Sequence, residues 1–418
     1  MKNKKVKVGV IGLGSRGLGI LKGILMKMYE ENLIEVLGVC DFYEDRAKAG
    51  FECVKSATGK EPICSTDYRD IINISEIEAV FVMTAWESHI EISTAAMKAG
   101  KQVGVEVGGA YSINDCFKLV RAFEETGKHC MMLENCCYGR KELMILNMVK
   151  QGVFGEIVHC SGGYLHDLRE EIANGDINRH YRQRNYFNRN CENYPTHELG
   201  PIAQILNINR GNRMLYLTSV ASCSKGLHEY IVEKRGAEHP LAKAEIAQGD
   251  IVTTVIKCAG GQTIVLTLDT TLPRSYSRGL TVRGTKGMYC EDGNYIHMDG
   301  ESEWTPVADK VNSADKYAEQ YEHPMWVEYK KNPVSGHDGI DWLVYNAFID
   351  SVKNSRIPPI DTYDTASWMC ISALSEESIA CGGMPVSIPD FTNGRWIERT
   401  ERNEGNDSIY SLSRVVSE

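Results

Sequence analysis

The stretch that decides the fold is Val6–Gly17, which reads VKVGVIGLGSRG. Its first half places Val6, Val8 and Val10 on one face, as in a buried strand, and its second half is rich in glycine. A helical pattern of apolar side chains follows, formed by Ile20, Leu21, Ile24, Leu25 and Met28. A strand that runs through a glycine-rich turn into a helix predicts a Rossmann-type α/β domain.

The glycines of this turn have separate physical tasks. Gly12 permits the tight turn, Gly14 lets backbone N–H groups approach a diphosphate, and Gly17 allows close packing of helix on strand. Ser15 and Arg16 open the following helix, whose N-terminus carries partial positive charge. The turn therefore predicts a dinucleotide site.

A carboxylate at the end of the second strand selects the dinucleotide. The apolar run Ile34–Cys40 ends on Asp41, 24 positions after Gly17. Such a side chain accepts hydrogen bonds from the adenosine ribose hydroxyls and repels a 2′-phosphate, which favours NAD over NADP. The alternative is a plain glycine turn followed by a surface aspartate.

The next segments continue the strand–helix alternation. Apolar runs at Ala79–Met83, Gln102–Val105 and Met131–Leu133 alternate with helical patterns at Ile90–Ala99 and Ile113–Glu125. This order predicts a doubly wound parallel sheet, and ligands bind at the carboxyl ends of its strands. The cofactor contacts expected at these strand ends are Trp86, His89, Glu106, Val107 and Asn135.

The pattern changes near residue 140. Lys141–Lys150 reads as a helix, and Ile251–Ala259 and Gln262–Asp269 are strands separated by Gly260-Gly261, a hairpin signal. Helical patterns return at residues 342–352 and 366–381. Further strand-like runs are Met214–Ala221, Arg278–Arg283 and Met288–His297. We expect an NAD-binding Rossmann domain at 1–138 and an α+β domain with an open antiparallel sheet at 139–418.

Composition and charge restrict the class of protein. The chain has 418 residues, 43% hydrophobic and 24% charged, with a net charge of −10. This acidic balance argues against nucleic acid and anionic membranes as partners. No apolar run is long enough to span a bilayer, and Met1–Lys5 leaves no room for a signal peptide before the first strand. We therefore expect a cytoplasmic protein, and a homo-oligomer.

Fourteen cysteines raise the question of a metal or of disulfides. The sequence has no Cys-x-x-Cys pair, and the adjacent Cys136 and Cys137 do not suit one tetrahedral ion. Most of these thiols are expected to be small buried hydrophobic groups in a reducing compartment. No metal is predicted.

Further motifs carry a resemblance to a known family. The most specific are Tyr-Pro-Thr-His at 194–197 and Tyr-Leu-His-Asp-Leu-Arg at 164–169. Others lie in the segments Thr84–His89, Met132–Tyr138, Pro273–Gly279, Gly336–Gly339 and Pro385–Phe391. With these motifs the chain resembles the Gfo/Idh/MocA oxidoreductases and, within them, the NAD-dependent glycosidases of glycoside hydrolase family 109, from about residue 8 to residue 396.

Two positions depart from the patterns that the resemblance implies. The oxidoreductases carry Glu-Lys-Pro where this chain has Glu106-Val107-Gly108, so the usual lysine that assists hydride transfer is missing. The glycosidases carry glycine after the histidine of Tyr-Pro-Thr-His, where this chain has Glu198. That carboxylate is expected either to face solvent or to enter the sugar pocket.

The resemblance implies a cycle without net redox change. The sugar is oxidised at C3 by hydride transfer to bound NAD, which acidifies the C2–H. A base removes that proton, the C1 substituent leaves, water adds at C1, and C3 is reduced again. Such chemistry needs groups that transfer protons near neutral pH, which His and Tyr supply, rather than the paired carboxylates of ordinary glycosidases.

The site residues follow from the matched motifs. We expect His197 to be the main acid/base, with Tyr164 or Tyr194 as its partner, and His166 to complete a second Tyr/His pair. Tyr194 also lies against the nicotinamide in this interpretation. Substrate contacts are expected from Tyr164, Arg184, Tyr194, His197 and Tyr276.

Two other functions stay open. The first is an ordinary NAD-dependent sugar dehydrogenase that releases its reduced cofactor, against which the valine at position 107 counts. The second is a non-catalytic protein that senses NAD or sugar, against which the two Tyr/His pairs count.

Overall fold

The computed structural model describes residues 5–334, 337–399 and 408–413, and its chain forms two compact units. The first unit contains Met1–Arg140, Pro324–Ser367 and Glu401–Arg414, and the second contains Lys141–His323, Trp368–Thr400 and Val415–Glu418. The division into domains 1–138 and 139–418 stays a prediction. Two parts of the sequence used above, residues 1–4 and Gly336, lie outside the described residues.

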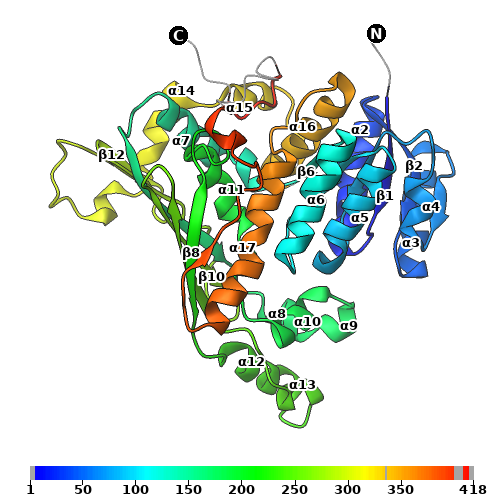
Figure 1. Cartoon of the computed structure of the whole chain (residues 1–418), viewed down its shortest axis with the longest axis horizontal. Coiled ribbons are helices and arrows are strands. Elements are labelled where there is room, and N and C mark those ends of the chain that lie inside the picture. The colour runs from blue at the N-terminus through cyan, green and yellow to red at the C-terminus, as the bar shows by residue number, and fades with distance from the viewer. Residues whose placement is uncertain (1–4, 335–336, 400–407, 414–418) are drawn as a thin grey trace. The chain divides into compact units, whose positions relative to one another are not determined.

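The sheet of the first unit is parallel, with strand order β3-β2-β1-β4-β5-β6 (Figure 1). Strand β1 pairs with β2 on one side and β4 on the other, so the direction of winding reverses there. The strands are β1 (Val6–Ile11), β2 (Ile34–Cys40), β3 (Ile63–Ser65), β4 (Ala79–Val82), β5 (Gln102–Val105) and β6 (Cys130–Met132). This doubly wound sheet confirms the predicted Rossmann fold.

Helices connect the strands of this sheet, and α3 to α6 lie along it (Figure 1). The first helical stretch contains a π-helical turn between two α-helical parts. The helical segments of the first unit are α1 (Ser15–Ile20), η1 (Leu21–Leu25), α2 (Met26–Glu30), α3 (Glu44–Thr58), α4 (Tyr68–Ile72), α5 (Trp86–Lys98), α6 (Ile113–Thr126), η2 (Asn135–Tyr138), α15 (Pro324–Tyr329), η5 (His337–Gly339) and α16 (Ile340–Asn354).

Late segments of the chain complete the first unit. On α16, Tyr345 stacks on Phe81 of β4 with ring centroids 5.2 Å apart, and Phe348 meets the same ring edge-on at 5.3 Å. Helix α17 (Thr362–Ala380) starts in this unit, and Thr362 Oγ1 accepts a 2.9 Å hydrogen bond from the N–H of Cys130 on β6. Helix α16 therefore packs against the sheet, and the start of α17 accepts a hydrogen bond from a backbone N–H group of its edge strand β6.

The second unit contains a mixed sheet with strand order β13-β12-β11-β7-β10-β9-β8-β14. Strands β9 and β10 form the expected hairpin, and Gly261 takes the positive φ of +93° in its turn. The strands are β7 (Ile157–Leu165), β8 (Met214–Ala221), β9 (Ile251–Cys258), β10 (Thr263–Asp269), β11 (Thr281–Gly284), β12 (Gly287–Cys290), β13 (Tyr295–Met298) and β14 (Val386–Ser387).

Two expectations about this sheet are wrong. Strand β7 pairs in parallel with β10, so the sheet is mixed rather than antiparallel. Turn signals reveal hairpin neighbours, whereas this pair is separated by about 100 residues. The run Met288–His297 is not one strand but the hairpin β12–β13, because Gly293 and Asn294 adopt positive φ and turn the chain.

Helices flank the strands of the second unit. They are α7 (Arg140–Lys150), α8 (Arg169–Ala173), α9 (Gly175–Asn178), α10 (Tyr181–Asn188), α11 (Thr196–Ile205), α12 (Gly226–Arg235), α13 (Pro240–Lys243), η3 (Val307–Lys310), η4 (Ser313–Tyr317), α14 (Ala318–Tyr321) and η6 (Arg395–Ile397), together with the later part of α17. Across the described ranges, no helix combines the length and the apolar character needed to cross a membrane.

Candidate functional site

The glycine-rich turn after β1 has the shape that a dinucleotide requires. A Cβ at Gly12, where φ is +97°, would lie 2.4 Å from the carbonyl carbon of Met83, and one at Gly17 would lie 2.0 Å from the Gly12 oxygen. At Gly14 the nearest atom to a Cβ is Nη1 of Arg46, at 3.5 Å. The fold therefore requires Gly12 and Gly17, whereas Gly14 borders open space in which a diphosphate fits against the backbone.

Asp41 is held rigidly at the end of β2. Its Oδ2 accepts a 2.6 Å hydrogen bond from the N–H of Leu13, and its Oδ1 accepts a 2.9 Å bond from the N–H of Tyr43. Each carboxylate oxygen keeps a second lone pair for another donor. The carboxylate thus ties the glycine-rich turn to β2 and fits the hydroxyls of an adenosine ribose.

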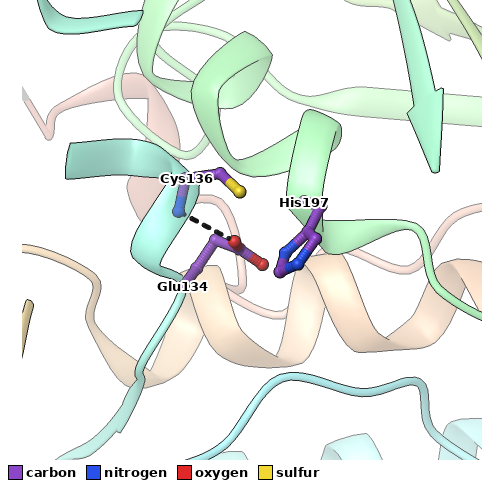
Figure 2. Close-up of side chains that lie close together, drawn as sticks. All are labelled: Glu134, Cys136 and His197. Carbon is purple, nitrogen blue, oxygen red and sulfur yellow. Dashed lines mark hydrogen bonds between the residues drawn. The ribbon is translucent and has the colours of Figure 1, made fainter. Parts of the chain in front are cut away.

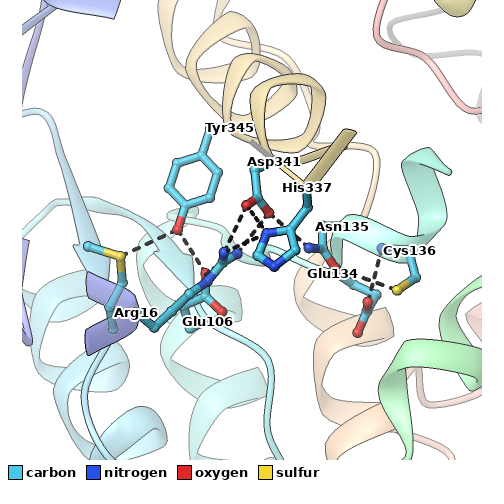
Figure 3. Close-up of polar contacts among 9 residues, drawn as sticks. Arg16, Glu106, Glu134, Asn135, Cys136, His337, Asp341 and Tyr345 are labelled. Carbon is cyan, nitrogen blue, oxygen red and sulfur yellow. Dashed lines mark hydrogen bonds and ion pairs between the residues drawn. The ribbon is translucent and has the colours of Figure 1, made fainter. Parts of the chain in front are cut away.

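Arg16 of the same turn lies in a network of charged side chains (Figure 3). Its Nη1 and Nη2 each donate a 2.8 Å hydrogen bond to one oxygen of Asp341 on α16. Its Nε donates to Oε1 of Glu106, which follows β5, at 3.2 Å, and the hydroxyl of Tyr345 donates to the same oxygen at 2.8 Å. The two carboxylates hold the Arg16 pKa above its usual value although burial acts in the opposite direction.

Side chains after β6 extend this network. Nδ2 of Asn135 donates a 2.8 Å hydrogen bond to Asp341, and Nδ1 of His337 lies 2.5 Å from the other oxygen of that carboxylate. The carboxylate of Glu134, the residue before Asn135, accepts a hydrogen bond from the backbone N–H of Cys136 (Figure 2). The carboxyl ends of β1, β5 and β6 thereby share one set of polar contacts.

The second unit brings together the Tyr/His residues expected from the motifs. Tyr164 of β7 and Tyr194, which precedes α11, have ring centroids 4.4 Å apart. The ring of His197 meets Tyr194 edge-on at 4.7 Å and Tyr164 at 5.3 Å. The Tyr164 hydroxyl lies 3.0 Å from Nδ1 of His166, whose ring is 5.0 Å from that of Tyr276. We call these five residues the ring cluster.

A buried arginine on α10 stands beside the ring cluster. The guanidinium carbon of Arg182 is 5.2 Å from the ring centroid of Tyr194 and 5.8 Å from that of Tyr164, within reach of a cation–π interaction. Its Nη1 also donates to Oε1 of Glu171 at 2.6 Å. Partial burial and the charge of Arg182 both lower the pKa of His166, so this imidazole is neutral at pH 7.

The segment before α11 is fixed through its backbone. The N–H of Glu192 donates to Oγ of Ser375 at 2.8 Å, and Oγ of Ser372 donates to the Glu192 carbonyl at 2.7 Å. Nε2 of Gln248 donates to the carbonyl of Cys191 at 3.1 Å. These contacts with α17 and with the loop before β9 position the turn that carries Tyr194.

Comparison with known proteins identifies both parts of the chain. Residues 6–134 match the model described as "Oxidoreductase family, NAD-binding Rossmann fold", and residues 138–398 match "Glycosyl hydrolase 109, C-terminal domain". An alpha-N-acetylgalactosaminidase of Tannerella forsythia is 39% identical, covering 94% of this chain and 88% of that protein. The chain belongs to glycosyl hydrolase family 109. It is thus a glycosidase with an NAD-binding Rossmann domain, as predicted.

Other family 109 proteins and several solved structures are similar to this chain. A glycosyl hydrolase family 109 protein of Parabacteroides distasonis is 38% identical and an alpha-N-acetylgalactosaminidase of Shewanella oneidensis is 34% identical, each over 94% of this chain, or 88% and 87% of those proteins. A levoglucosan dehydrogenase in complex with NADH and levoglucosan aligns with a TM-score of 0.66 at 17% identity, covering 93% of this chain and 100% of that one. This last likeness shows the fold.

Three expected cofactor contacts lie inside the Rossmann unit. Nε2 of His89 lies 2.9 Å from the carbonyl oxygen of Thr84, and complete burial lowers its pKa to about 4. A neutral histidine in that position supports the turn between β4 and α5 through Nε2. Trp86 and Val107 are also buried, and a Cβ at Gly108 would lie 2.5 Å from the Trp86 ring. Their contacts with NAD stay predictions.

The arginine expected to contact the substrate does not lie on the side of α10 that faces the ring cluster. Arg184 is exposed, whereas Arg182, on the other side of α10, is buried against the ring cluster. Positions two apart on a helix point in nearly opposite directions. Arg182 is therefore a second candidate for the substrate contact, and that of Arg184 stays a prediction. Tyr276 stands at the rim, with 53% of its surface exposed.

Glu198, where this family 109 chain departs from the motif, does not adopt the solvent-facing orientation. Its side chain is fully buried, and a Cβ on Gly162 of β7 would lie 1.9 Å from the Glu198 Cγ. The carboxylate therefore packs on β7 inside the second unit, where its charge adds to the effect of burial in raising the pKa of the Cys160 thiol. It does not face solvent, and its expected entry into a sugar pocket stays a prediction.

Proposed function

We propose that this chain hydrolyses terminal α-N-acetylgalactosaminides, and related α- or β-hexosides, in a redox-neutral cycle. The observation that carries the proposal is the ring cluster, in which phenol and imidazole groups meet beside one buried guanidinium. Such groups exchange protons near neutral pH, which elimination and addition at a sugar require. The names of the Tannerella and Shewanella relatives support the N-acetylgalactosamine specificity.

When bound, NAD supplies a reversible oxidation of the sugar at C3. The turn around Gly14 would hold the diphosphate through backbone N–H groups, and Asp41 would orient the adenosine ribose. Arg16, Glu106 and Asn135 would border the other half of the cofactor. These residues bind and orient, and they take no part in proton transfer.

The ring cluster performs the proton transfers in this proposal. His197 acts as the main acid/base, removing the C2 proton or assisting departure of the C1 group, and Tyr194 or Tyr164 is its partner. The Tyr164 hydroxyl passes a proton to the neutral His166 over the 3.0 Å between its oxygen and Nδ1. Because His166 is partly exposed, the buried phenol can exchange protons with solvent through this imidazole. Arg182 stabilises negative charge that develops on either phenol oxygen.

Two measurements test the function. Purified protein, shown by native mass spectrometry to carry NAD, should cleave nitrophenyl α-N-acetylgalactosaminide without added cofactor. Reaction in heavy water should place deuterium at C2 of the released sugar and leave C3 protonated. Accumulation of reduced cofactor in proportion to product would instead show a sugar dehydrogenase, and a fully protonated C2 would exclude elimination.

We also propose that the protein works in the cytoplasm as a homo-oligomer, without nucleic acid or membrane partners. All fourteen cysteines are free thiols, and Cys64, Cys223 and Cys381 are exposed, which suits a reducing compartment. Fractionation of the native cells tests the location, and sedimentation of purified protein tests the oligomer.

A further inference from the structure

One carboxylate on α16 joins groups from across the whole Rossmann unit. Asp341 is 2% exposed, and it receives hydrogen bonds from Arg16, Asn135 and His337 (Figure 3). Arg16 is 325 positions away in the sequence. A buried carboxylate with several charged or polar donors is a fixed negative centre, because removing any donor leaves part of its charge unpaired.

The contacts of Arg16 leave a defined part of its guanidinium for a ligand. An arginine has five N–H donors. Nε and Nη2 each approach Oε1 of Glu106 at 3.2 Å, and Nη1 and Nη2 each donate to Asp341 at 2.8 Å. Four donors are thus directed at the two carboxylates. Nη1 also lies 3.3 Å from Nδ1 of His337, which carries a proton beside the ionised Asp341 and therefore cannot accept one. The fifth donor, on Nη1, is thus left for another acceptor, and the side chain remains 34% exposed.

His337 is brought to the same carboxylate by a strained turn. His337, Asp338 and Gly339 all have positive φ, at 41°, 55° and 98°. Non-glycine residues in this region are costly, and such strain persists where the surrounding structure enforces it, most often at functional sites. The ring of Tyr329 packs closely against this turn, because a Cβ at Gly339 would lie 2.2 Å from its hydroxyl oxygen.

The contact also fixes the protonation of the imidazole at Nδ1. Asp341 is ionised, because the hydrogen bonds from Arg16 and His337 hold its pKa below the usual range against the effect of burial. An ionised carboxylate only accepts, so Nδ1 of His337 must carry a proton. Nε2 is then turned away from Asp341 on a side chain that is 65% exposed.

The position of the network selects one half of the dinucleotide. The two halves of a doubly wound sheet each take one mononucleotide. Asp41, at the end of β2, lies on the half that takes the adenosine. Arg16, Glu106 and Asn135 lie at the carboxyl ends of β1, β5 and β6, on the half that takes the nicotinamide mononucleotide.

We propose that Asp341 is a positioning residue for the cofactor: it holds Arg16 and His337 so that their remaining nitrogen atoms contact the phosphate and ribose oxygens of the nicotinamide half. This inference rests on the proposed function, because a redox-neutral cycle must return hydride from the same dinucleotide that received it. If the reduced cofactor dissociated in mid-cycle, the sugar would remain oxidised at C3 and the cycle could not be completed. The network therefore serves retention of NAD.

The test compares two carboxylates of the same helix. Asp350 on α16 also forms an ion pair, in which its Oδ2 lies 3.1 Å from Nη1 of Arg356, but it takes no part in the network. In Asp341→Asn, calorimetry with NAD added to cofactor-stripped protein should show binding weakened about 10- to 100-fold, the effect of losing hydrogen bonds to a charged group. Asp350→Asn should bind as the wild type does.

Two further readouts separate positioning from folding. The increase in Tm that saturating NAD produces should shrink in Asp341→Asn, whereas a purely structural role would lower the Tm of stripped and loaded protein equally. Because the His337 side chain is exposed, His337→Gln should fold normally and lose NAD faster during buffer exchange.

Wild-type NAD affinity in Asp341→Asn, or in both Arg16→Gln and His337→Gln if Asp341→Asn does not fold, would overturn the proposal. An equal loss of Tm in stripped and loaded Asp341→Asn would do the same. Wild-type protein that binds no NAD at all would instead overturn the proposed function, so the two failures are distinguishable.

Discussion

The network around Arg16 and the ring cluster around Tyr164 are built from different kinds of contact. In the network, charged side chains meet end to end, at 2.8 Å between Arg16 and Asp341. In the ring cluster, Tyr164, Tyr194 and His197 meet through ring faces and edges. The first arrangement fixes the protonation state of its side chains, and the second fixes only the positions of its rings.

This difference follows from what each region must do. Paired charges hold their protonation state over a wide pH range, as the raised pKa of Arg16 and the lowered pKa of Asp341 show, and a binding region needs that constancy. A region that exchanges protons needs groups whose two forms are close in free energy at neutral pH. Apolar ring contacts position such groups without committing them to one charge state.

Removing the central imidazole of the ring cluster should have the largest effect. His197→Ala is expected to lower kcat by about 10²- to 10⁴-fold, as loss of a general acid/base does, while NAD stays bound. Steady-state kinetics and native mass spectrometry measure the two quantities. The control is His228→Ala on α12, whose imidazole contacts the carbonyl of Ala242. A His197→Ala enzyme with more than about half the wild-type kcat would make His197 structural.

A matched pair of arginines on α10 tests whether the ring cluster needs a fixed charge of its own. Arg182→Gln should lower kcat/KM by about 10²-fold, the effect of losing one group that stabilises developing negative charge. Arg184→Gln, two positions away and exposed, should change it less than about 2-fold. Equal effects of the two substitutions would refute the preference for Arg182 over Arg184 as the substrate contact.

The packing of Glu198 on β7 predicts a stability effect rather than a change of specificity. Gly162→Ala should destabilise the protein by about 1–3 kcal/mol, because its Cβ would overlap the Glu198 Cγ. Adding Glu198→Gly should restore more than half of that loss. Thermal denaturation of the single and double variants measures both, with Gly19→Ala, whose Cβ would meet no atom within 4 Å, as the control. Independent effects of the two substitutions would contradict this packing.

The smallest effect concerns pH. Burial and Arg182 lower the pKa of His166, so its neutral form should persist below the ordinary histidine value of 6.5. The acid limb of kcat/KM should therefore appear below pH 6.5, because activity is lost only as the imidazole gains a proton. His166→Gln should remove this limb. A limb that stays in place in the variant would assign it to another group.

Local sequence signals predicted the parts of the molecule that local geometry determines. The glycine-rich turn, Asp41 and the Gly260-Gly261 hairpin are each specified by a few consecutive residues. The role of Asp341 could not be predicted, because its partner Arg16 is brought to it by tertiary packing. Arg182 was not proposed, because the sequence did not reveal helix α10, whose phase buries Arg182 and exposes Arg184. The parallel pairing of β7 with β10 is equally non-local.

The return of the chain to its first unit has a consequence for biosynthesis. Some 183 residues, 141–323, separate the Rossmann strands from the segment that carries α16. At ribosomal rates of 5–20 residues per second, this segment emerges roughly 10 to 40 s after the sheet that it completes. If Asp341 positions the cofactor, a nascent or truncated chain that lacks it can fold its strands and still bind the dinucleotide only weakly. Stable loading with NAD would then mark a polypeptide whose synthesis has passed residue 341.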